Sequence, residues 1–591
     1  MMSSPSSVDP MEFFVEQVAG DDVTARVQSM RKLKMIGDAL GREETLSRLI
    51  PFLNENVDGD DEILLSMASE LGKFVPGLVP GPRAFPIITI LEQLAAVEET
   101  VVRDKAIASI NVIVPFLEKS DAPALLSMIK RLVNADWFTS KVSACGVFHT
   151  VYKKLVSSEG RREMRSLFKE LSEDETPMVR RSAARNFGPF VEMIEQDHVI
   201  SDMLPVFRAL CNDESDSVRQ LAIGGTHSIA KALTDPGINS DTILPIVRNA
   251  SNDLSWRVRN NLAKGFSGIV KNMGVKPSDM GELFRCYSSL LRDNEAEVRA
   301  GAVIEIAKMT QLGGSNLFLT FVADTLPSLA EDGVMEVRSK LAQSIMACVE
   351  PSICGKLSDT IIVKSFMPIF ESFLSDEYSE VQLHILNNLS RVSHLLSKMD
   401  GIVNKILDMT NDKNWRVKKA VAILMPFLAE SMGVEFFESY LLDSWMKLLQ
   451  DRVADVRSAI VISIIKLSKV TGPAWIHKEI LPRTKRLYAN STSYLTRVTI
   501  IGCYVSLASN EVTHRQLQEE LISLLLKSFD DNVPNVRMIS AKGLRQFSHH
   551  CDDTAVVMKI KTALTQRIAR EDDDDCKYFS QMALDDIVSF F

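Results

Sequence analysis

The stretch Asp253-Leu-Ser-Trp-Arg-Val-Arg259 decides the fold, because its pattern returns along most of the chain, for instance as Asp293-Asn-Glu-Ala-Glu-Val-Arg299. In each copy an Asp precedes a Val by five residues, and a basic residue follows the Val. Clean copies begin at Asp174, Asp213, Asp253, Asp293, Asp332, Asp412, Asp451 and Asp531, and weaker ones at Asp21, Asp58, Val97, Asp136, Asp376, Asn490 and Glu571. A period of about 40 residues is typical of stacked two-helix repeats of the HEAT or armadillo kind.

Each repeat contains two apolar segments, and the second has the spacing of an amphipathic helix. Val258, Leu262 and Phe266 lie at i, i+4 and i+8, so this segment should bury one face. The first segment often contains an interior proline, as in Leu204-Pro205 and Leu481-Pro482, which predicts a kinked helix. One repeat cannot bury its own apolar face. We therefore expect an all-α superhelix, a solenoid of about 15 HEAT repeats.

The Asp and the basic residue of each repeat have a physical reason to occur together. The Asp lies in the turn before the second helix, where a carboxylate can cap free N–H groups. The basic residue falls in the first turn of that helix, which is the unfavourable end for a cation, so it needs a carboxylate from an adjacent repeat. We expect a structural ladder made of Asp174, Asp213, Arg219, Asp253, Arg259, Asp293, Arg299, Asp332, Arg338, Asp412, Lys418, Asp451, Arg457, Asp531 and Arg537.

Composition restricts the class of protein. The chain has 591 residues, 46% of them hydrophobic and 24% charged, and a net charge of -10, which disfavours nucleic acid as a partner. No stretch approaches about 18 consecutive apolar residues, so we expect no membrane span. Eight cysteines without a C-x-x-C pair favour reduced thiols in the cytoplasm or the nucleus. Residues 1–10 are small and polar, and we expect a disordered tail there rather than a signal peptide.

The sequence contains no phosphate-binding loop, no metalloprotease or esterase motif and no kinase signature, so we expect no catalytic residue and no cofactor. The run His549 to Asp553 lacks zinc-ligand spacing, and a solvated helix end is favoured there over a metal site. Asp58, Asp60 and Asp61 lack the later glycine and glutamate of a calcium loop. The acidic run Glu571 to Asp575 is expected to be a solvated turn before the last helix rather than a partner-binding tail.

Several turns carry aromatic residues. Trp256 and Trp415 occupy equivalent positions, in Ser-Trp-Arg-Val-Arg and Asn-Trp-Arg-Val-Lys, and Trp137 and Tyr494 lie in two other turns. Tryptophan, tyrosine and arginine on a rigid scaffold are the residues of protein-binding hot spots. The alternative is that each ring simply packs on the next turn, and the sequence favours neither.

A set of short phrases, distributed in register along the chain, is more specific than the general repeat. They are Glu98-Glu-Thr-Val-Val-Arg-Asp-Lys-Ala106, Asp136-Trp-Phe-Thr-Ser140, Ser143-Ala-Cys-Gly146, Thr176-Pro-Met-Val-Arg-Arg181, Trp256-Arg-Val-Arg259, Glu295-Ala-Glu-Val-Arg-Ala300, Gly433-Val-Glu-Phe-Phe437 and Lys577-Tyr-Phe579. Over essentially the whole chain after residue 10, the sequence resembles the scaffolding A subunits (65 kDa regulatory subunits) of protein phosphatase 2A.

The resemblance implies a non-catalytic scaffold in a heterotrimer, without nucleic acid or membrane as a partner. It implies that the turns of repeats 11–15, in residues 395–591, hold the phosphatase catalytic subunit through Trp415, Arg416, Tyr494 and Val533. It also implies that turns of repeats 2–8, within residues 11–394, receive interchangeable regulatory B subunits. The residues implicated in that second role are Glu98, Glu99, Pro177, Met178, Arg180, Arg181, Trp256 and Arg257.

The chain departs from the family pattern at two places. Ala454 stands where the family usually has an aromatic residue, which weakens one expected contact with the catalytic subunit. The turns of repeats nine and ten, at residues 333–336 and 377–380, also diverge. This leaves the central part of the array poorly specified.

Two other functional classes remain open at this point. A nuclear transport receptor of the importin-beta kind would have the same fold, but it would have more repeats and an acidic loop inserted in one of them. The helical part of a lipid or protein kinase would need a catalytic domain for which the chain has no room. Binding to a GTP-loaded Ran-type GTPase would identify the first class, and enzymatic activity of the isolated chain would identify the second.

Overall fold

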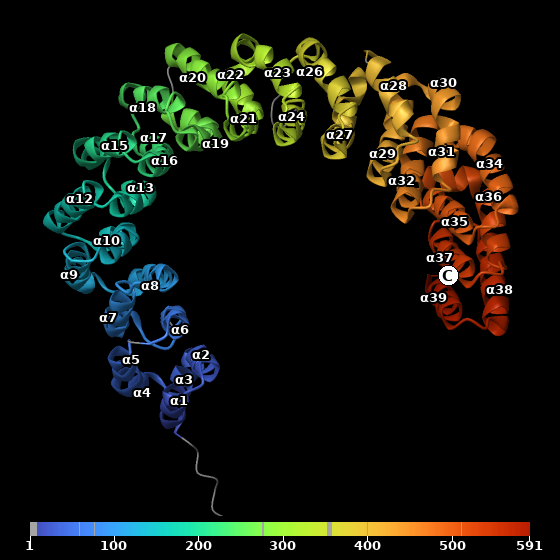
Figure 1. Ribbon diagram of the computed structural model, residues 1–591. Helices are drawn as coiled ribbons and strands as arrows, with labels where there is room; N and C mark the ends of the chain where they lie inside the picture. Colours follow the sequence, from blue (N-terminus) through green and yellow to red (C-terminus); the bar gives the residue numbers. More distant parts are fainter. Residues whose placement is uncertain are drawn as a thin grey trace, which may run out of the picture. The chain divides into compact units, whose positions relative to one another are not determined.

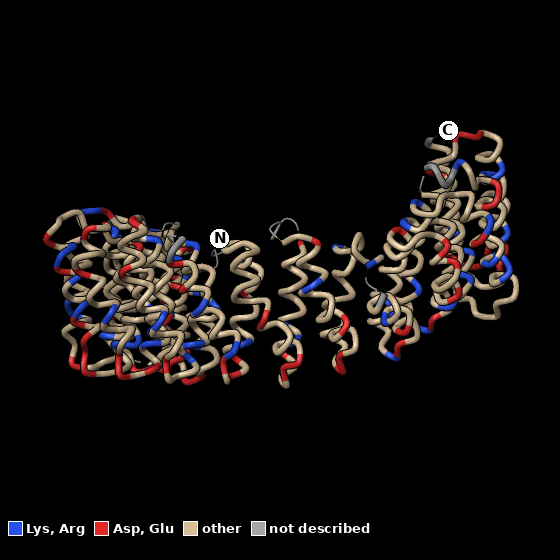
Figure 2. The backbone as a smooth tube through the Cα atoms, turned by 90° about the horizontal axis from the view of Figure 1, so that it is seen from above, with Lys and Arg blue, Asp and Glu red and all other residues tan. Residues whose placement is uncertain are grey.

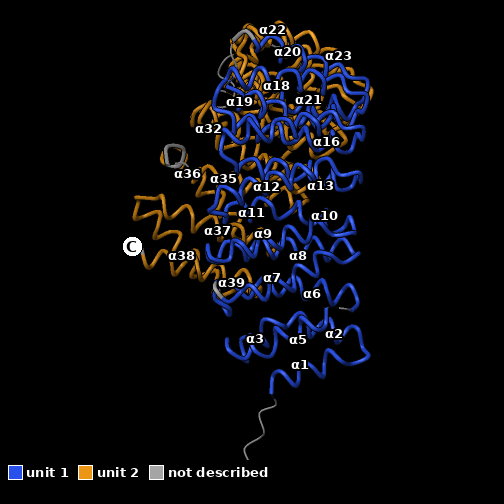
Figure 3. Tube along the Cα trace, turned by 90° about the vertical axis from the view of Figure 1, so that its left-hand side faces the viewer, with its two compact units in different colours: residues 1–305 blue, residues 306–591 orange. Residues whose placement is uncertain are grey.

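The computed structural model describes residues 9–57, 59–75, 77–274, 277–350, 357–398, 400–509 and 511–590, and structural statements concern these residues. They fold into helices, and no strand occurs among them. The chain divides into two compact units, residues 1–305 and 306–591 (Figure 3). Within each unit, paired helices repeat along the chain (Figure 1). The expected all-α solenoid of HEAT repeats is therefore confirmed.

Unit 1 contains a row of first helices and a row of second helices, and consecutive second helices pack directly on one another. The second helices are α6 (Asp61–Leu71), α8 (Thr100–Ile113), α10 (Phe138–Cys145), α13 (Pro177–Val191), α16 (Asp216–Gly224), α19 (Trp256–Met273) and α21 (Ala296–Val303). The first helices are α5 (Ile50–Glu55), α7 (Phe85–Leu94), α9 (Ala122–Val133), α12 (Ser158–Ser172), α15 (Leu204–Cys211), α18 (Pro236–Ser251) and α20 (Pro277–Leu291). Unit 1 begins with the short helices α1 (Pro10–Ala19), α2 (Val23–Met30), α3 (Leu33–Leu40) and α4 (Arg42–Glu44). Its second row also includes α11 (Phe148–Lys154) and α17 (Thr226–Ala232).

Unit 2 has the same arrangement, with second helices in continuous contact from one repeat to the next. These are α24 (Met335–Cys348), α27 (Ser379–Leu386), α29 (Trp415–Met432), α32 (Ala454–Thr471), α35 (Tyr494–Ala508), α37 (Pro534–His549) and α39 (Asp574–Phe590). α22 (Ile306–Phe321) joins the end of a second helix to the start of the next first helix across a kink at Gly314, and α23 (Leu326–Ala330) completes that first helix. The other first helices are α26 (Asp359–Leu374), α28 (Asp400–Met409), α31 (Leu442–Leu448), α34 (Leu481–Asn490), α36 (Glu511–Ser528) and α38 (Thr554–Arg570). Short turns α30 (Val434–Phe436) and α33 (Pro473–Trp475) precede two of them.

The apolar stripe predicted for the second helices forms the core. In α19, Val258, Leu262 and Phe266 are at most 1% exposed. In α32, Val456 and Ile460 are completely buried, as are the equivalent Val417 and Val421 of α29. The periodicity of the sequence thus predicted the correct face of these helices, because each face packs between the helices of adjacent repeats.

Interior prolines change the type of helix at several first helices. A π-helical turn ends just before Pro51, Pro205 and Pro482, in η1 (Thr45–Leu49), η5 (Val199–Met203) and η9 (Ile476–Ile480). Proline cannot donate the usual i→i−4 hydrogen bond, and a wider turn relieves this conflict. By contrast, Pro245 and Pro368 lie inside uninterrupted helices. The sequence predicted a kink at these prolines. The structure has a π-helical turn before three of them and a continuous helix at the other two, so the kink itself stays a prediction.

The second helix of the divergent repeat ten is broken. After α27 it continues as the 3₁₀-helical segment η7 (Leu389–Lys398), with a non-helical residue at Val392. At Gly314, whose φ of 72° lies in the left-handed region that favours glycine, the chain turns from the second helix of repeat eight into the first helix of repeat nine. Gly433 and Gly472 have the same role after α29 and α32, so the turn at Gly314 is regular and the irregularity lies in repeat ten.

The first helix begins within the segment that was expected to be a disordered tail. α1 begins at Pro10, and Asp9 accepts a hydrogen bond from the N–H of Met11 at 2.9 Å. The helix therefore includes the end of the segment 1–10 that was expected to be a tail, while residues 1–8 lie outside the described part. The expected division between residues 394 and 395 was based on partner binding and stays a prediction, since the packing units meet after Glu305.

Among the described residues, no single helix is long and apolar enough to cross a membrane. Only α32 together with residues 473–490 reaches the required length and composition, as a pair bent by 117°.

Two isoleucines of α32 provide a matched test of the core. Ile460 is completely buried, whereas Ile462 is 67% exposed. We expect Ile460→Ala to lower the local stability of α32 by about 2–5 kcal/mol, because it leaves a cavity between repeats. Ile462→Ala should change it by less than about 0.5 kcal/mol. Amide hydrogen exchange of α32 and its neighbours measures both effects, and equal effects of the two substitutions would contradict the assigned packing.

Candidate protein-binding surface

The turns that join the first and second helices of each repeat lie along one edge of each unit. In Figure 2 the acidic residues of this edge in unit 1 form a red border, with blue segments beside it. The turns contain the Asp residues of the repeat, and the basic residues lie in the first turn of the second helices. This edge therefore combines the most regular charge pattern of the sequence with a set of short, exposed loops.

A ladder arginine joins two repeats through its three guanidinium nitrogens, as Arg219 shows. Arg219 donates from Nε and Nη2 to both carboxylate oxygens of Asp253 in the next turn, at 2.8 and 2.9 Å. Its Nη1 donates to the backbone carbonyl of Asp213 in its own turn, at 2.8 Å. Arg259 repeats the arrangement with Asp293 at 2.6 and 2.9 Å, and with the carbonyl of Asp253 at 2.7 Å. Such paired contacts to a carboxylate are among the strongest hydrogen bonds in proteins.

The same ion pairs recur in both units, and we call them the charge ladder. Each is partly buried, and each joins a basic residue of one repeat to an acidic residue of the following turn. In unit 1 the ladder consists of Lys141–Asp174, Arg180–Asp213, Arg219–Asp253 and Arg259–Asp293. In unit 2 it consists of Arg338–Asp376, Lys418–Asp451, Arg497–Asp531 and Arg537–Glu571. Arg299 donates to the carbonyl of Asp293 in its own turn at 2.7 Å, and Asp332 accepts from the N–H of Val334 at 3.0 Å.

The Asp residues do not cap the second helices in the manner expected from the sequence. Asp213 accepts from the N–H of Ser215 at 2.9 Å, and Asp253 accepts from the N–H of Ser255 at 2.8 Å. Ser215 and Ser255 are themselves the N-cap residues. The carboxylate therefore fixes the turn one step before the helix. Its Oδ1 accepts both from this N–H and from the arginine of the preceding repeat, and its Oδ2 accepts from the same arginine.

Pairing shifts the pKa of several ladder residues in the direction that keeps them charged. Burial by itself would raise the pKa of the Asp253 carboxyl, but hydrogen bonds from Arg219 and from the N–H of Ser255 outweigh burial and lower that pKa. The hydrogen bond to Asp293 raises the pKa of Arg259. Glu571 is the extreme case, because the guanidinium groups of Arg537 and Arg567 overcome burial and lower its pKa to about 2.

Two positions of the ladder lack the usual residue. Gln382 stands where other repeats have a basic residue, and it donates to the carbonyl of Asp376 at 2.8 Å. The turn before α35 lacks an acid. The sequence assigned Asn490 to this position, but Arg497 donates to the carbonyl of Ser491, six residues before it, as the other arginines do to their Asp. The position therefore belongs to Ser491, and the assignment of Asn490 was wrong.

The two equivalent tryptophans each stack with the arginine that follows them. The guanidinium of Arg257 lies 5.0 Å from the ring centre of Trp256, and that of Arg416 lies 4.6 Å from Trp415. Both rings are half-buried, whereas both arginines are exposed. Each pair begins a second helix whose position the charge ladder fixes. The result is a rigid aromatic and cationic surface on unit 1, and a matching one on unit 2.

The remaining residues implicated by the resemblance have different environments. Glu98 and Pro177 are exposed, and Met178 is 50% exposed. Glu99 accepts from the N–H of Val101 at 3.4 Å and so caps α8. Arg180 is only 9% exposed, because its guanidinium is occupied by the ladder.

Three further residues complete that set. Arg181 is half-buried, and its Nε is buried without a hydrogen-bond partner among the described residues. In unit 2, Tyr494 is 40% exposed at the start of α35, and Val533 is half-buried before α37. Within each unit, these residues lie at the same edge as the tryptophan pair of that unit.

Sequence reasoning missed several exposed apolar residues on the same edge. Leu254 is 99% exposed, in the turn position after the Asp where most copies have a polar residue. An apolar residue at this usually polar turn position could have been recognised from the sequence as exposed. Val101, Phe138, Val334, Tyr378 and Leu495 are also among the exposed large hydrophobic residues, but they start helices, where an apolar residue in a sequence gives no sign of exposure.

The weaker candidates from the sequence do not form a metal site. No group of three or more His, Cys, Asp or Glu side chains suited to a metal occurs among the described residues. Asp553 caps α38 by accepting from the N–H of Ala555 at 2.8 Å, and Cys551 is buried against Gln518. Asp60 pairs with Arg26 at 3.1 Å, while Asp58 lies outside the described residues.

The acidic run at residues 571–575 was expected to be solvated, and this was wrong for its first residue. Glu571 has a side chain only 1% exposed, because Arg537 and Arg567 both bind it. Asp573 caps α39 by accepting from the N–H of Cys576 at 2.9 Å. Glu571 therefore belongs to the charge ladder and not to a solvated tail.

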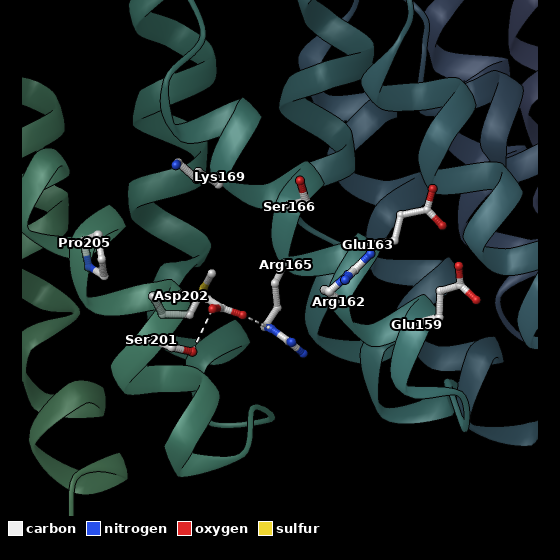
Figure 4. A pocket seen from close by; sticks show the side chains of 10 residues that line it. Glu159, Arg162, Glu163, Arg165, Ser166, Lys169, Ser201, Asp202 and Pro205 are labelled. Carbon is white, nitrogen blue, oxygen red and sulfur yellow. Dashed lines mark hydrogen bonds and ion pairs between the residues drawn. The ribbon is translucent and has the colours of Figure 1, made fainter.

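A charged groove of about 560 Å³ lies on the first-helix row of unit 1, between α12 and the segment η5–α15. Arg165 donates to Asp202 at 2.6 Å, and Ser201 donates to the other oxygen of Asp202 at 2.7 Å (Figure 4). Basic and acidic side chains alternate around it, and those at its base are paired with each other. The groove has no arrangement of nucleophile and base that would indicate chemistry.

The fold and the turn edge together define a helical-repeat protein of the HEAT class. A solved structure of Kap95p with RanGDP aligns with a TM-score of 0.62, covering 98% of this chain and 82% of that one at 12% identity. The crystal structure of Kap121p bound to RanGTP aligns with a TM-score of 0.60 over 99% of this chain and 64% of that one, at 15% identity. At such low identity the likeness concerns the fold alone. No family model matches the sequence.

Sequence comparison is more specific. The beta isoform of the human 65 kDa regulatory A subunit of serine/threonine-protein phosphatase 2A (PP2A) is 36% identical over 403 residues, which are 66% of this chain and 64% of that protein. The PP2A regulatory A subunit of Schizosaccharomyces pombe is 36% identical over 45% of each chain. That of Saccharomyces cerevisiae is 35% identical over 47% of this chain and 46% of its own length. The chain thus spans between about half and two thirds of the length of these relatives, and it is a homologue of the 65 kDa regulatory A subunits of PP2A.

The buried carboxylate of Glu571 leads to a prediction about acid stability. Its folded pKa of about 2 lies below the ordinary value of 4.5, so its contribution to stability is present above pH 4.5 and is lost as the pH falls toward 2. We expect Glu571→Gln to lower the thermal midpoint of unit 2 at pH 7 and to flatten its pH dependence between about 4.5 and 2. Thermal unfolding across this pH range measures both changes.

Asp572→Asn is the matched control, because Asp572 belongs to the same acidic run but is exposed. It should leave the acid transition unchanged. If Glu571→Gln had the same pH dependence as the unsubstituted protein, the ion pair between Arg537 and Glu571 would not contribute to the acid stability of unit 2.

Proposed function

We propose that the chain is the non-catalytic scaffold subunit of a protein phosphatase 2A heterotrimer, acting in the cytoplasm and the nucleus. It holds the phosphatase catalytic subunit on the turns of its C-terminal repeats, and an interchangeable regulatory B subunit on the turns of its N-terminal repeats. Homology to proteins named as regulatory subunits of PP2A supports the assignment to this phosphatase. The geometry of the turns supports binding at those positions.

The observation that carries the proposal is the stacked pair of Trp415 and Arg416 at the start of α29. Tryptophan and arginine are the residues most often found as binding hot spots. Arg416 is exposed and lies over a half-buried indole, so both offer surface without having to reorganise. Lys418, in the same helical turn, binds Asp451 in the ladder and thus holds the pair in place. A preorganised contact loses little conformational entropy on binding.

Tyr494 and Val533 extend this surface in unit 2. They begin the second helices of later repeats, and Asp531 accepts from the N–H of Val533 at 3.0 Å while it binds Arg497. The ladder therefore spaces these side chains at one repeat each. A partner that contacts several turns at once must match this spacing as well as the side chains.

On unit 1 the equivalent surface would receive the B subunit. Trp256 and Arg257 form its stacked pair, and Met178 and Leu254 contribute exposed apolar area on neighbouring turns. Arg180 serves the ladder, so its part in binding is to position the turn that presents Pro177. Interchangeable partners are compatible with such a surface, since each can use a different subset of turns.

A scaffold of this kind acts by raising effective concentration. Two partners held on one chain meet at a concentration set by the frame that links them and not by their bulk concentrations. The B subunit would in this way bring substrates to the catalytic subunit. The scaffold itself needs no catalytic residue for this role.

The alternative is a nuclear transport receptor of the importin-beta kind. It is favoured only by the likeness of fold to Kap95p and Kap121p at 12–15% identity. Binding of the full-length chain to a GTP-loaded Ran-type GTPase would support this alternative. We expect no such binding.

Two equivalent tryptophans allow a crossed test. We expect Trp415→Ala in the full-length chain to weaken binding of purified phosphatase catalytic subunit by about 30-fold or more, the range of a hot spot near 2 kcal/mol, with little effect on a B subunit. Trp256→Ala should do the reverse. Isothermal calorimetry of each variant with each subunit measures these affinities.

Each variant is the control for the other, because both remove the same ring from the same position of a repeat. Equal losses for both partners would indicate damage to the fold and not to a contact. A full-length chain that binds the two subunits only in competition, and never together, would contradict the scaffold role.

A further inference from the structure

Ser491 occupies a position that is acidic in every repeat of the charge ladder as defined above. Ladder arginines donate from Nη1 to the carbonyl six residues before them, which is that of Asp213 for Arg219 and that of Asp531 for Arg537. Arg497 makes the same contact with the carbonyl of Ser491 at 3.0 Å. The backbone of this turn therefore has the ladder geometry, although its side chain has no charge.

The preceding repeat contains the arginine that this position should bind. Arg457 precedes Ser491 by the same 34 residues that separate Arg219 from Asp253, and Arg537 from Glu571. Its Nη1 donates to the carbonyl of Asp451 in its own turn at 2.7 Å, as in the other repeats. Within the described part of the chain, no carboxylate lies within ion-pair distance of Arg457. A partly buried guanidinium thus has a serine at the ladder position where its equivalents have a carboxylate.

We propose that Ser491 is a phosphorylation site, and that its phosphate completes the charge ladder by binding Arg457. A phosphoserine carries nearly two negative charges and three strong acceptor oxygens. Arginine binds phosphate with two parallel hydrogen bonds, as it binds a carboxylate. The chemistry of the missing ladder residue is therefore the chemistry that phosphorylation supplies.

The reaction requires a serine kinase and ATP as co-reactants. The Ser491 hydroxyl oxygen attacks the γ-phosphorus of ATP, an O–P bond forms to the serine, and the bond between the γ-phosphorus and the bridging oxygen of ADP breaks. The hydroxyl proton passes to a base of the kinase. The products are phosphoserine and ADP, and no oxidation or reduction takes place.

The turn is open to such a reaction. The Ser491 hydroxyl donates only to the carbonyl of Ser493, at 3.2 Å, in an exposed hydrogen bond. Thr492 and Ser493 are exposed, and Tyr494 begins α35 with 40% of its surface accessible. Before phosphorylation, this turn lacks the ion pair that fixes most other turns of unit 2. The turn at Asp412 also follows a repeat without a ladder cation, because Gln382 stands there, but it has its own carboxylate. At Ser491 the cation is present and the negative charge is missing, so a modification of this turn can complete the pair.

Phosphorylation would act on the junction between α32 and α35. A rung from Arg457 to phosphoserine 491 would join these two helices as Arg497–Asp531 joins α35 to α37. It would also place negative charge beside Tyr494 and Leu495, two exposed side chains of the turn surface. The inference rests on the ladder geometry alone and does not depend on the identity of the partners.

The first test installs phosphoserine at position 491 of the full-length chain by genetic code expansion. We expect amide exchange in the turn and in the first turn of α35 to slow by about five-fold, the effect of a partly buried ion pair. The same phosphoserine combined with Arg457→Gln should give no slowing. Ser491→Asp should reproduce part of the effect, again only when Arg457 is present.

Phosphothreonine at position 492 is the matched control, because it adds the same charge one residue outside the ladder position. Slowing that is equal for both phosphorylated residues, or that persists in Arg457→Gln, would overturn the assigned contact. These comparisons remain valid even if Arg457→Gln alone is less stable, since each is made within one background.

The second test asks whether the modification occurs. The full-length chain is purified from a eukaryotic host with phosphatase inhibitors present, and trypsin releases the peptide from Leu487 to Arg497. We expect mass spectrometry to find a phosphate on Ser491. A complete set of fragments without phosphate at this residue, or with phosphate only on Thr492 or Ser493, would overturn the proposal.

Discussion

A cation in the first turn of a helix is held against the dipole of that helix, and this conflict organises the whole edge of the array. The second helices of most described repeats from Lys141 onward contain such a cation. It is stable there because carbonyl groups of its own turn and a carboxylate of the next turn both bind it. The arginine therefore fixes the conformation within one repeat and the spacing between two. An apolar core alone would allow neighbouring helices to slide, whereas paired hydrogen bonds accept a single register.

The hydrogen bonds of the ladder arginines also hold the exposed side chains of the turns in place. Side chains such as Trp256 and Trp415 lie within a few residues of a ladder cation, and both stack on an arginine of the same helical turn. Large side chains are effective contacts when they are immobile before binding. The function that we propose uses this property at several turns of each unit. The binding surface is thus a by-product of the way in which the repeats are held together.

The sequence predicted the fold and much of the ladder, because both depend on short, periodic patterns. The buried stripe of α19 follows from helical spacing, and the pairing of Arg219 with Asp253 follows from the period. The sequence did not reveal that Asp253 fixes Ser255 rather than the helix itself, nor that Glu571 is buried, since both depend on the exact course of a turn. Leu254 was missed although its position after the Asp is polar in most copies, whereas exposed apolar residues such as Val101 and Leu495 gave no such sign. The residues that we propose as partner contacts follow from the resemblance, and the geometry shows which of them are exposed.

The π-helical turns before Pro51, Pro205 and Pro482 bear on how such an array changes during evolution. A π turn is what results when one residue is inserted into an α-helix and the surrounding pairing is kept. These turns lie in first helices, away from the ladder. A gain or loss of single residues is therefore absorbed on the side of the array that does not set the register. A single insertion or deletion at these turns would change the length of a repeat and leave unchanged the spacing of the edge that we propose as the binding surface.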